Sequence, residues 1–273
     1  MAESSKSTVT PKQKKHLRKI AHLGGIARLK KYGSVAIDEE KRKQMWKMWW
    51  EREGKYKSQS ILVGRAIHEP KYSTNLAEFV GIMIGDGGVS NYFITVTLHA
   101  ETDRRYSSFV SRLMEQLFKV KPRVYRKKNS NAVDVVIHRK KLVEFCCSIG
   151  LKKGNKLKQN LDIPLWVKEN PEYARSCLRG LVDTDGTFFI HKYFSKGRRY
   201  GYRKISFSSY SPALIKSFHA PLKSFCIKSE IAYNGLAVRI ESQENVKKYL
   251  EVIGTHNPKH REKFIFTEGC AEW

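Results

Sequence analysis

Two segments of this sequence share a pattern that constrains the fold more than any other feature. Each is a short apolar run with helical spacing that ends in an Asp-Gly pair, and a strand-like segment follows each pair. The first run covers residues 76–87 and the second covers residues 178–186. A chain with two such runs is expected to consist of two similar halves, each organised around one run.

Small residues lie on one face of each run. Residues four apart share a face of a helix, and this spacing groups Gly81 with Gly85 in the first run and Gly180 with Thr184 in the second. A glycine inside a helix costs roughly 0.5–1 kcal/mol relative to alanine, but it lets a second backbone approach closely. We therefore predict that Gly81, Gly85 and Gly180 lie at the interface between two paired helices.

Each run also places an aspartate at the C-terminal end of its helix, where the helix dipole is negative. Pairing the helices would bring Asp86 and Asp185 together, which is unfavourable unless cations lie beside them. Mg²⁺ is usually bound by one or two carboxylates with phosphate and water oxygens. A single Asp-Gly pair is an ordinary turn or helix end, but two in a repeated context favour a metal site. A calcium loop does not fit, because its first and twelfth positions would be Leu181 and Lys192.

The segments after the two runs repeat one order of elements. Each half is expected to contain a helix, two strands, a second helix, two strands and a third helix. The later helices are expected at 102–118 and 141–149 in the first half, and at 212–225 and 244–253 in the second. Residues 196–199 are expected to form a basic loop between two strands of the second half.

The two runs resemble the paired motifs of LAGLIDADG homing endonucleases, in the form that carries both motifs in one chain. The second run reads Leu-Arg-Gly-Leu-Val-Asp-Thr-Asp-Gly and is close to the motif, whereas the first has Ile84 where the motif has its first Asp. The final acidic residue, which the family uses for metal, is present in both runs. The resemblance covers roughly residues 72–267.

The resemblance implies an α+β fold in which two pseudo-symmetric αββαββα units form a DNA-binding saddle. The first unit would span residues 72–168 and the second residues 169–267. Because the repeat supplies the pseudo-two-fold within one chain, we expect a monomer.

Residues 1–70 lie outside the region of resemblance and are expected to form a basic helical N-terminal extension and a linker. Three short helices are expected, at about 10–23, 26–32 and 38–54, with breaks at Gly24-Gly25 and at Gly33. Two interpretations stay open. The extension is either a helix-turn-helix-like DNA-binding segment or a basic arm that contacts phosphates without reading bases.

The resemblance also implies a metal site and two catalytic lysines. Asp86 and Asp185 would bind Mg²⁺, or another divalent cation such as Mn²⁺, with Gly85 and Thr184 at the same site. A basic residue that lies beside the metal carboxylates in the family corresponds here to Lys156 and Lys259, each of which follows an Ile-Gly and an Asn. Such a lysine would orient water or stabilise the charge that builds on phosphorus. The alternative role for each lysine is a simple phosphate contact.

The sheets of the two units are predicted to lie along double-stranded DNA. A two-stranded ribbon fits the major groove, where side chains distinguish all four base pairs. The candidate contacts are basic residues on or near the expected strands: Arg123, Arg126, Lys127, Lys128, His138, Arg139, Lys192, Arg198, Arg199, Arg203, Lys204 and Arg239.

The overall charge agrees with a polyanionic partner. The chain has 52 Lys and Arg against 26 Asp and Glu, a formal net charge of +26, and such a charge destabilises a compact state by self-repulsion. No uncharged apolar run approaches the roughly 20 residues of a membrane-spanning helix, and no signal peptide is visible. The five cysteines lack Cys-x-x-Cys spacing, so neither zinc nor a disulfide framework is indicated. We expect a protein of the cytoplasm, associated with the nucleoid, or of an organelle, and not a secreted one.

The expected function is that of a site-specific homing endonuclease. It would make double-strand breaks at a long asymmetric DNA target by metal-dependent hydrolysis of phosphodiester bonds. The alternative is a non-cleaving binder on the same scaffold, either an intron RNA maturase or a transcriptional regulator. The presence of both terminal aspartates and both lysines favours the enzyme. A ribosomal RNA-binding protein would explain the charge but not the two Asp-Gly runs.

Overall fold

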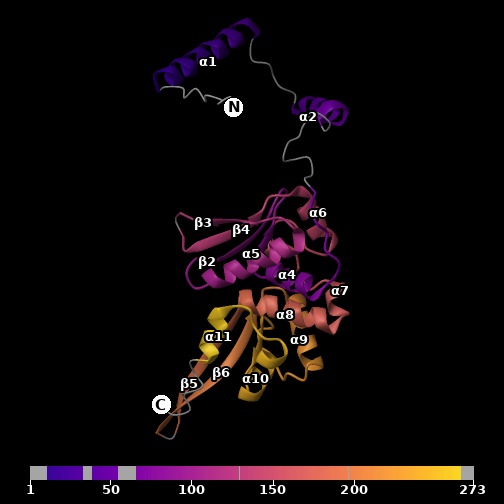
Figure 1. Cartoon of the computed structure of the whole chain (residues 1–273), viewed down its shortest axis with the longest axis vertical. Helices are drawn as coiled ribbons and strands as arrows, with labels where there is room; N and C mark the ends of the chain where they lie inside the picture. The colour runs from indigo at the N-terminus through magenta and orange to yellow at the C-terminus, as the bar shows by residue number, and fades with distance from the viewer. Residues whose placement is uncertain (1–10, 33–38, 55–65, 129, 196, 266–273) are drawn as a thin grey trace, which may run out of the picture. The chain divides into compact units, whose positions relative to one another are not determined.

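The computed structural model describes residues 11–32, 39–54, 66–128, 130–195 and 197–265 (Figure 1). The chain divides into a smaller unit, Met1–Val63, and a larger unit, Gly64–Trp273. Among the described residues, no helix has the length and apolar character needed to cross a membrane.

The described part of the smaller unit is helical. Helix α1 (Pro11–Tyr32) is continuous, so the predicted break at Gly24-Gly25 is wrong. The cost of about 1 kcal/mol per helical glycine is offset here by the good helix formers on either side. Gly33 lies outside the described residues. Helix α2 (Glu39–Trp49) continues into the π-helical turn η1 (Trp50–Gly54), and the two open interpretations of this extension remain predictions.

The larger unit repeats one order of elements, as predicted. The first half contains α4 (Thr74–Ile84), β1 (Gly87–Val89), β2 (Ile94–His99), α5 (Arg104–Phe118), β3 (Arg123–Arg126), β4 (Ala132–Ile137) and α6 (Lys140–Ser148). The second contains α8 (Pro171–Asp185), β5 (Gly186–Ser195), β6 (Arg198–Ser208), α9 (Pro212–Ser224), β7 (Glu230–Ile231), β8 (Ala237–Ile240) and α10 (Gln243–Val252). Three short helices, η2 (Lys156–Lys158), α7 (Leu165–Lys168) and α11 (Pro258–Ile265), follow the third helices of the halves.

Each half builds one four-stranded antiparallel sheet. The strand orders are β1-β2-β4-β3 and β5-β6-β8-β7, which confirms the α+β class. Strands β5 and β6 pair from Gly186↔Phe207 to Ser195↔Arg198, so the prediction of a basic loop at 196–199 is wrong for its last two residues. Arg198 and Arg199 belong to β6, because cross-strand pairing continues past the expected end of the hairpin.

Alternation along the strands places one face of each sheet in the core. In β2, Ile94, Val96 and Leu98 are buried while the intervening threonines are half-buried. Helix α5 buries its apolar stripe, which includes Tyr106, against the same core. Complete burial of one such aliphatic side chain contributes roughly 1.5–3 kcal/mol, so these sheet-on-helix layers hold each half together.

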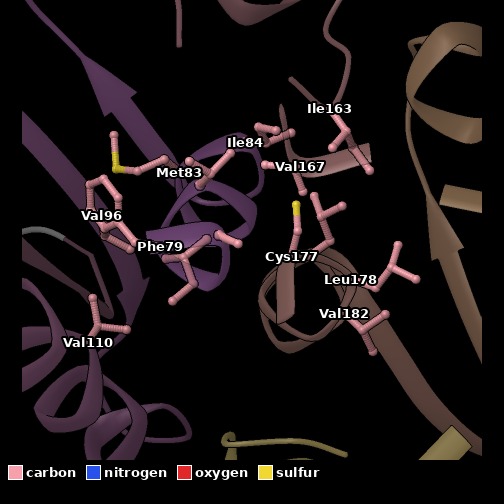
Figure 2. Close-up of a cluster of buried hydrophobic side chains, with 14 of the residues drawn as sticks. Phe79, Met83, Ile84, Val96, Val110, Ile163, Val167, Cys177, Leu178 and Val182 are labelled. Carbon is pink, nitrogen blue, oxygen red and sulfur yellow. The ribbon is translucent and has the colours of Figure 1, made fainter. Parts of the chain in front are cut away.

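The two halves meet where α4 packs along α8 (Figures 1 and 2). A Cβ added to Gly81 would collide with the Cys177 carbonyl oxygen and lie 3.1 Å from the Leu181 nitrogen. A Cβ on Gly180 would collide with the Glu78 carbonyl oxygen in the same way. The two helix backbones are therefore in direct contact, and apolar side chains such as Phe79 and Leu178 flank the crossing (Figure 2).

The crossing predicts a selective effect of added methyl groups. Gly180→Ala should lower the unfolding free energy of the larger unit by about 1–3 kcal/mol, because the rigid α4 backbone leaves no room for a side chain. Gly24→Ala is the matched control, since nothing lies within 4 Å of a Cβ at that helical position. Urea denaturation followed by circular dichroism measures both. Equal stability of the Gly180→Ala variant and the wild type would contradict the close helix contact.

Candidate active site at the paired helix ends

The two predicted aspartates lie at the C-terminal ends of the paired helices. Helix α4 ends at Ile84, and the N–H of its C-cap residue Gly85 donates to the Gly81 carbonyl at 3.0 Å. Asp86 follows directly, before β1 begins. Helix α8 ends at Asp185, and β5 begins at the next residue. The helix-to-strand junction of each half thus presents one carboxylate.

The junctions are close to each other. A Cβ on Gly85 would lie 3.4 Å from the Asp185 Oδ2 atom and would collide with the Thr184 hydroxyl. The structure therefore brings together the four residues that the sequence analysis associated with metal, which are Gly85, Asp86, Thr184 and Asp185. The absence of a side chain at Gly85 is what lets the α8 end approach.

The carboxylates are in an unfavourable electrostatic environment. Burial raises the pKa of Asp86 from 3.8 to about 7, and the negative charge of Asp185 adds to this rise. Asp185 is accessible to solvent, but the protein packed around its carboxyl raises its pKa as well. The ionised form of each aspartate is therefore unfavourable unless further positive charge lies nearby.

Lys156 is the cation that the fold places at this pair. It lies in η2, after the third helix of the first half. Its Nζ atom donates to the Ile84 carbonyl at 2.9 Å and also to the Gly85 carbonyl. Its positive charge partly opposes the rise in the pKa of Asp86 and of Asp185, and burial lowers the pKa of Lys156 itself. The ammonium therefore neutralises the negative end of α4 beside the carboxylates.

Lys259, the second predicted catalytic lysine, has a different environment. Its Nζ atom lies 2.9 Å from the Asp103 Oδ1 atom. Asp103 belongs to the first half and is only 6% exposed. The structure does not place the two lysines in equivalent surroundings.

A buried polar network beneath the site was not expected from the sequence. Glu78, in α4, is 1% exposed and lies 2.8 Å from Arg179 Nη2 and 2.6 Å from His256 Nδ1. Asp183, in α8, accepts hydrogen bonds from the Thr255 hydroxyl and from the backbone N–H of His256. The motif contains Asp183 but gives no sign of its partners, which come from the loop before α11.

The donor set at the helix ends fits a hard divalent cation. Among the residues that the structure describes, no group of three or more His, Cys, Asp or Glu side chains is arranged to hold a metal ion. Two carboxylates with backbone oxygens leave several positions for phosphate oxygens and water, which is the coordination that Mg²⁺ prefers. Because the pKa values of both carboxyls are raised, a bound cation would stabilise their ionised forms.

The predicted DNA contacts are distributed over both faces of the sheets. Strand alternation and register place Arg123, Arg198, Lys204 and Arg239 on the faces opposite the buried residues, and Arg126, Lys192, Arg199 and Arg203 on the other. Lys127, Lys128 and His138 are exposed and Arg139 is half-buried near the strand ends. Several of these residues form ion pairs within the protein: Lys204 lies 3.0 Å from Glu241, Lys127 lies 3.3 Å from Asp134, and Arg126 lies 3.9 Å from Glu101.

Comparison with protein families finds one match inside the second half. Residues 172–254 match the LAGLIDADG-like domain. Among curated proteins, the replication factor C small subunit of Methanocaldococcus jannaschii is 28% identical over 148 residues, which is 50% of this chain and 8% of that protein. The chain therefore spans a small part of this relative.

Solved structures with a similar arrangement include I-DmoI in complex with DNA and Mn, which is 16% identical with a TM-score of 0.46, over 66% of this chain and 96% of that one. The I-LtrWI LAGLIDADG homing endonuclease bound to target DNA is 12% identical with a TM-score of 0.49, over 71% and 89%. Full-length DUF199/WhiA from Thermatoga maritima is 17% identical with a TM-score of 0.44, over 75% and 64%. At these sequence identities the likeness concerns the fold alone.

The raised pKa of Asp86 predicts a pH-dependent gain of stability on its replacement. The Asp86 carboxyl binds its proton more tightly in the folded state than in the unfolded state. Protonation of Asp86 therefore stabilises the fold fully below pH 3.8, and this stabilisation is lost as the pH rises through about 7. Asp86→Asn should therefore raise the unfolding free energy of the metal-free protein at pH 8 by about 1–2 kcal/mol, a figure reduced for solvent screening. The gain should shrink toward pH 4.

Urea denaturation in EDTA at several pH values measures this gain. Asp162→Asn is the matched control, because Asp162 forms a surface pair with Lys168. An Asp86→Asn variant that is less stable than the wild type at pH 8 would contradict the electrostatic account of the site.

Proposed function

We propose that this chain, whose residues 172–254 match the LAGLIDADG-like domain, is a site-specific endonuclease that makes double-strand breaks in DNA. The observation that carries the proposal is the convergence of Asp86 and Asp185 at the ends of α4 and α8, with the Lys156 ammonium beside them. Each half supplies one carboxylate, which suits one phosphodiester of each strand.

A purely structural role explains this convergence poorly. Two neighbouring carboxylates at two negative helix ends, one of them half-buried, destabilise the fold, and a neutral residue at either position would relieve the repulsion. The presence of both acids is explained if they hold divalent cations together with DNA phosphates. Mg²⁺ or Mn²⁺ bound there would lower the pKa of water and neutralise a leaving oxygen.

The residues of the chain would then have distinct roles. Asp86 and Asp185 hold the cations, with Gly85 and Thr184 forming the tight junction that keeps the carboxylates together. Lys156, already positioned at the α4 end, would stabilise the charge that develops on the phosphate.

Double-stranded DNA is the proposed partner. The formal charge of +26 favours a polyanion, and the exposed basic residues of the two sheets would contact phosphates and base edges. The halves differ in strand length, with a ten-residue β5 where β1 has three residues, so the target should be asymmetric. We expect one chain to suffice for binding.

Selection from a DNA library tests the proposal. A plasmid library with long randomised inserts is incubated with the protein in Mg²⁺ or in EDTA, and linear products are recovered and sequenced. The wild type and the Asp162→Asn control should linearise one class of insert only in Mg²⁺. Asp86→Asn and Asp185→Asn should bind that insert but cleave it at least about 100-fold more slowly, as expected for loss of transition-state electrostatics.

Selective retention of an insert without cleavage in any divalent metal would overturn the nuclease. That outcome would favour the alternative of a non-cleaving binder, either a maturase or a transcriptional regulator. Binding of intron RNA in preference to duplex DNA would separate these two.

Metal binding should also appear as a gain of thermal stability in the absence of DNA. Added Mn²⁺ or Mg²⁺ relieves carboxylate repulsion, and a ligand at about 100 times its dissociation constant stabilises a protein by about 2.7 kcal/mol. Differential scanning fluorimetry should show a rise in Tm for the wild type and for Asp162→Asn. The rise should be absent in the Asp86→Asn/Asp185→Asn double variant, and a rise that the double variant keeps would place the cation elsewhere.

A further inference from the structure

The two lysines that follow the third helices make different contacts. The Lys156 Nζ atom donates to backbone carbonyls at the end of α4. The Lys259 Nζ atom forms an ion pair with the buried Asp103 at 2.9 Å, and the backbone N–H of Lys259 donates to Asn257 Oδ1 at 3.2 Å. One lysine therefore faces the aspartate pair, while the other faces a different carboxylate.

Asp103 is placed to hold the tail of the other half. It occupies the N-cap position of α5 but makes no side-chain capping hydrogen bond to that helix. Its Oδ1 atom instead accepts from Asn257 Nδ2 at 3.0 Å and pairs with Lys259. Burial opposes its ionisation, but the hydrogen bonds from Asn257 and Lys259 outweigh burial and lower the pKa of Asp103. Its charge is thus committed to these partners.

The equivalent position in the second half carries a neutral residue. Ser211 is the N-cap of α9, and its side chain accepts from the Leu214 N–H. The Ser211 hydroxyl donates to the Leu161 carbonyl at 2.6 Å, in the tail of the first half. Each N-cap therefore touches the tail of the opposite half, but one supplies a carboxylate and the other a hydroxyl.

Because of this difference, the charge near Lys156 differs from the charge near Lys259. Lys156 lowers the pKa of both Asp86 and Asp185. The effect of Lys259 on Asp86 is smaller than that of Lys156 and is opposed by the charge of Asp103. A phosphate that approaches Lys156 would meet a positive charge, whereas one that approaches Lys259 would meet an ammonium already paired with the Asp103 carboxylate.

We infer that Asp103 is a positioning residue that holds the Lys259 ammonium in an ion pair, so that the two lysines serve the two DNA strands unequally and the strands are cut in sequence. The strand that depends on Lys156 is cut first. This inference rests on the proposed nuclease function. Each cut forms one bond from a water oxygen to phosphorus and breaks one bond from phosphorus to a deoxyribose oxygen, and the proton of the water passes through solvent to the leaving oxygen.

The first arm of the test needs neither metal nor DNA. The metal-free full-length protein is treated with an acylating reagent, and the modification of single lysines is followed by peptide mass spectrometry. Asp103→Asn should increase the reaction rate of Lys259 by at least about threefold, because the charge-assisted contact with the buried Asp103 carboxylate holds the amine in place and limits its access to the reagent. The rate of Lys168 is the control. An unchanged Lys259 rate would overturn the role given to Asp103.

The second arm follows both strands of the selected duplex, each labelled at a different end. The wild type should cut one strand at least about tenfold faster than the other, a ratio within the range that one electrostatic donor provides. Asp103→Asn should bring the two rates to within about threefold of each other by accelerating the slower strand. Lys156→Met should slow the faster strand, and Lys259→Met should change that strand little.

The outcomes separate this inference from the function it rests on. Cleavage of both strands at equal rates by the wild type, or a strand ratio that Asp103→Asn leaves unchanged, would overturn the inference while the nuclease stands. Binding without any cleavage would overturn both. If Asp103→Asn fails to fold, Asp103→Ser replaces it, since serine occupies the equivalent position 211 in the other half.

Discussion

The direct contact between the α4 and α8 backbones determines most of what the larger unit can do. Gly81 and Gly180 remove the side chains that would separate the two helices, and the apolar residues on either side bury the remaining surface (Figure 2). Because the contact continues to Gly85, which packs against the Thr184 side chain, the two helix ends are also held close together. The position of the carboxylates thus follows from a packing constraint, and a methyl group at the crossing would shift the carboxylates as well as lower the stability.

The helix contact brings several negative groups together, and neighbouring residues of the site offset part of this repulsion. Lys156 donates to the carbonyls at the end of α4, and the buried Glu78 carboxylate pairs with Arg179 and lies 2.6 Å from His256 Nδ1. The Glu78–Arg179 ion pair joins the two halves, and removal of one partner from such a buried pair typically destabilises a protein by about 3–5 kcal/mol. Asp86 and Asp185 are left with raised pKa values.

The sequence predicted the parts of this account that depend on local pattern. Apolar periodicity and the repeated Asp-Gly pairs were sufficient for α4, α8 and the order of elements, and helical spacing pointed to Gly81 and Gly180. Two predictions from local pattern were wrong. Gly24-Gly25 does not break the first helix, and Arg198 and Arg199 belong to a strand and not to a loop. The pairing of Asp103 with Lys259 was out of reach, because a contact between residues so distant in sequence depends on the complete tertiary fold.

Anomalous diffraction from crystals of the protein soaked in Mn²⁺ would show whether Asp86 and Asp185 jointly hold a divalent cation, as we propose. We expect an anomalous peak within about 2.0–2.6 Å of a carboxylate oxygen of both aspartates, the range for hard cations with oxygen ligands. Anomalous peaks only at other sites, with Lys156 and the two carboxylates unchanged, would contradict this proposal.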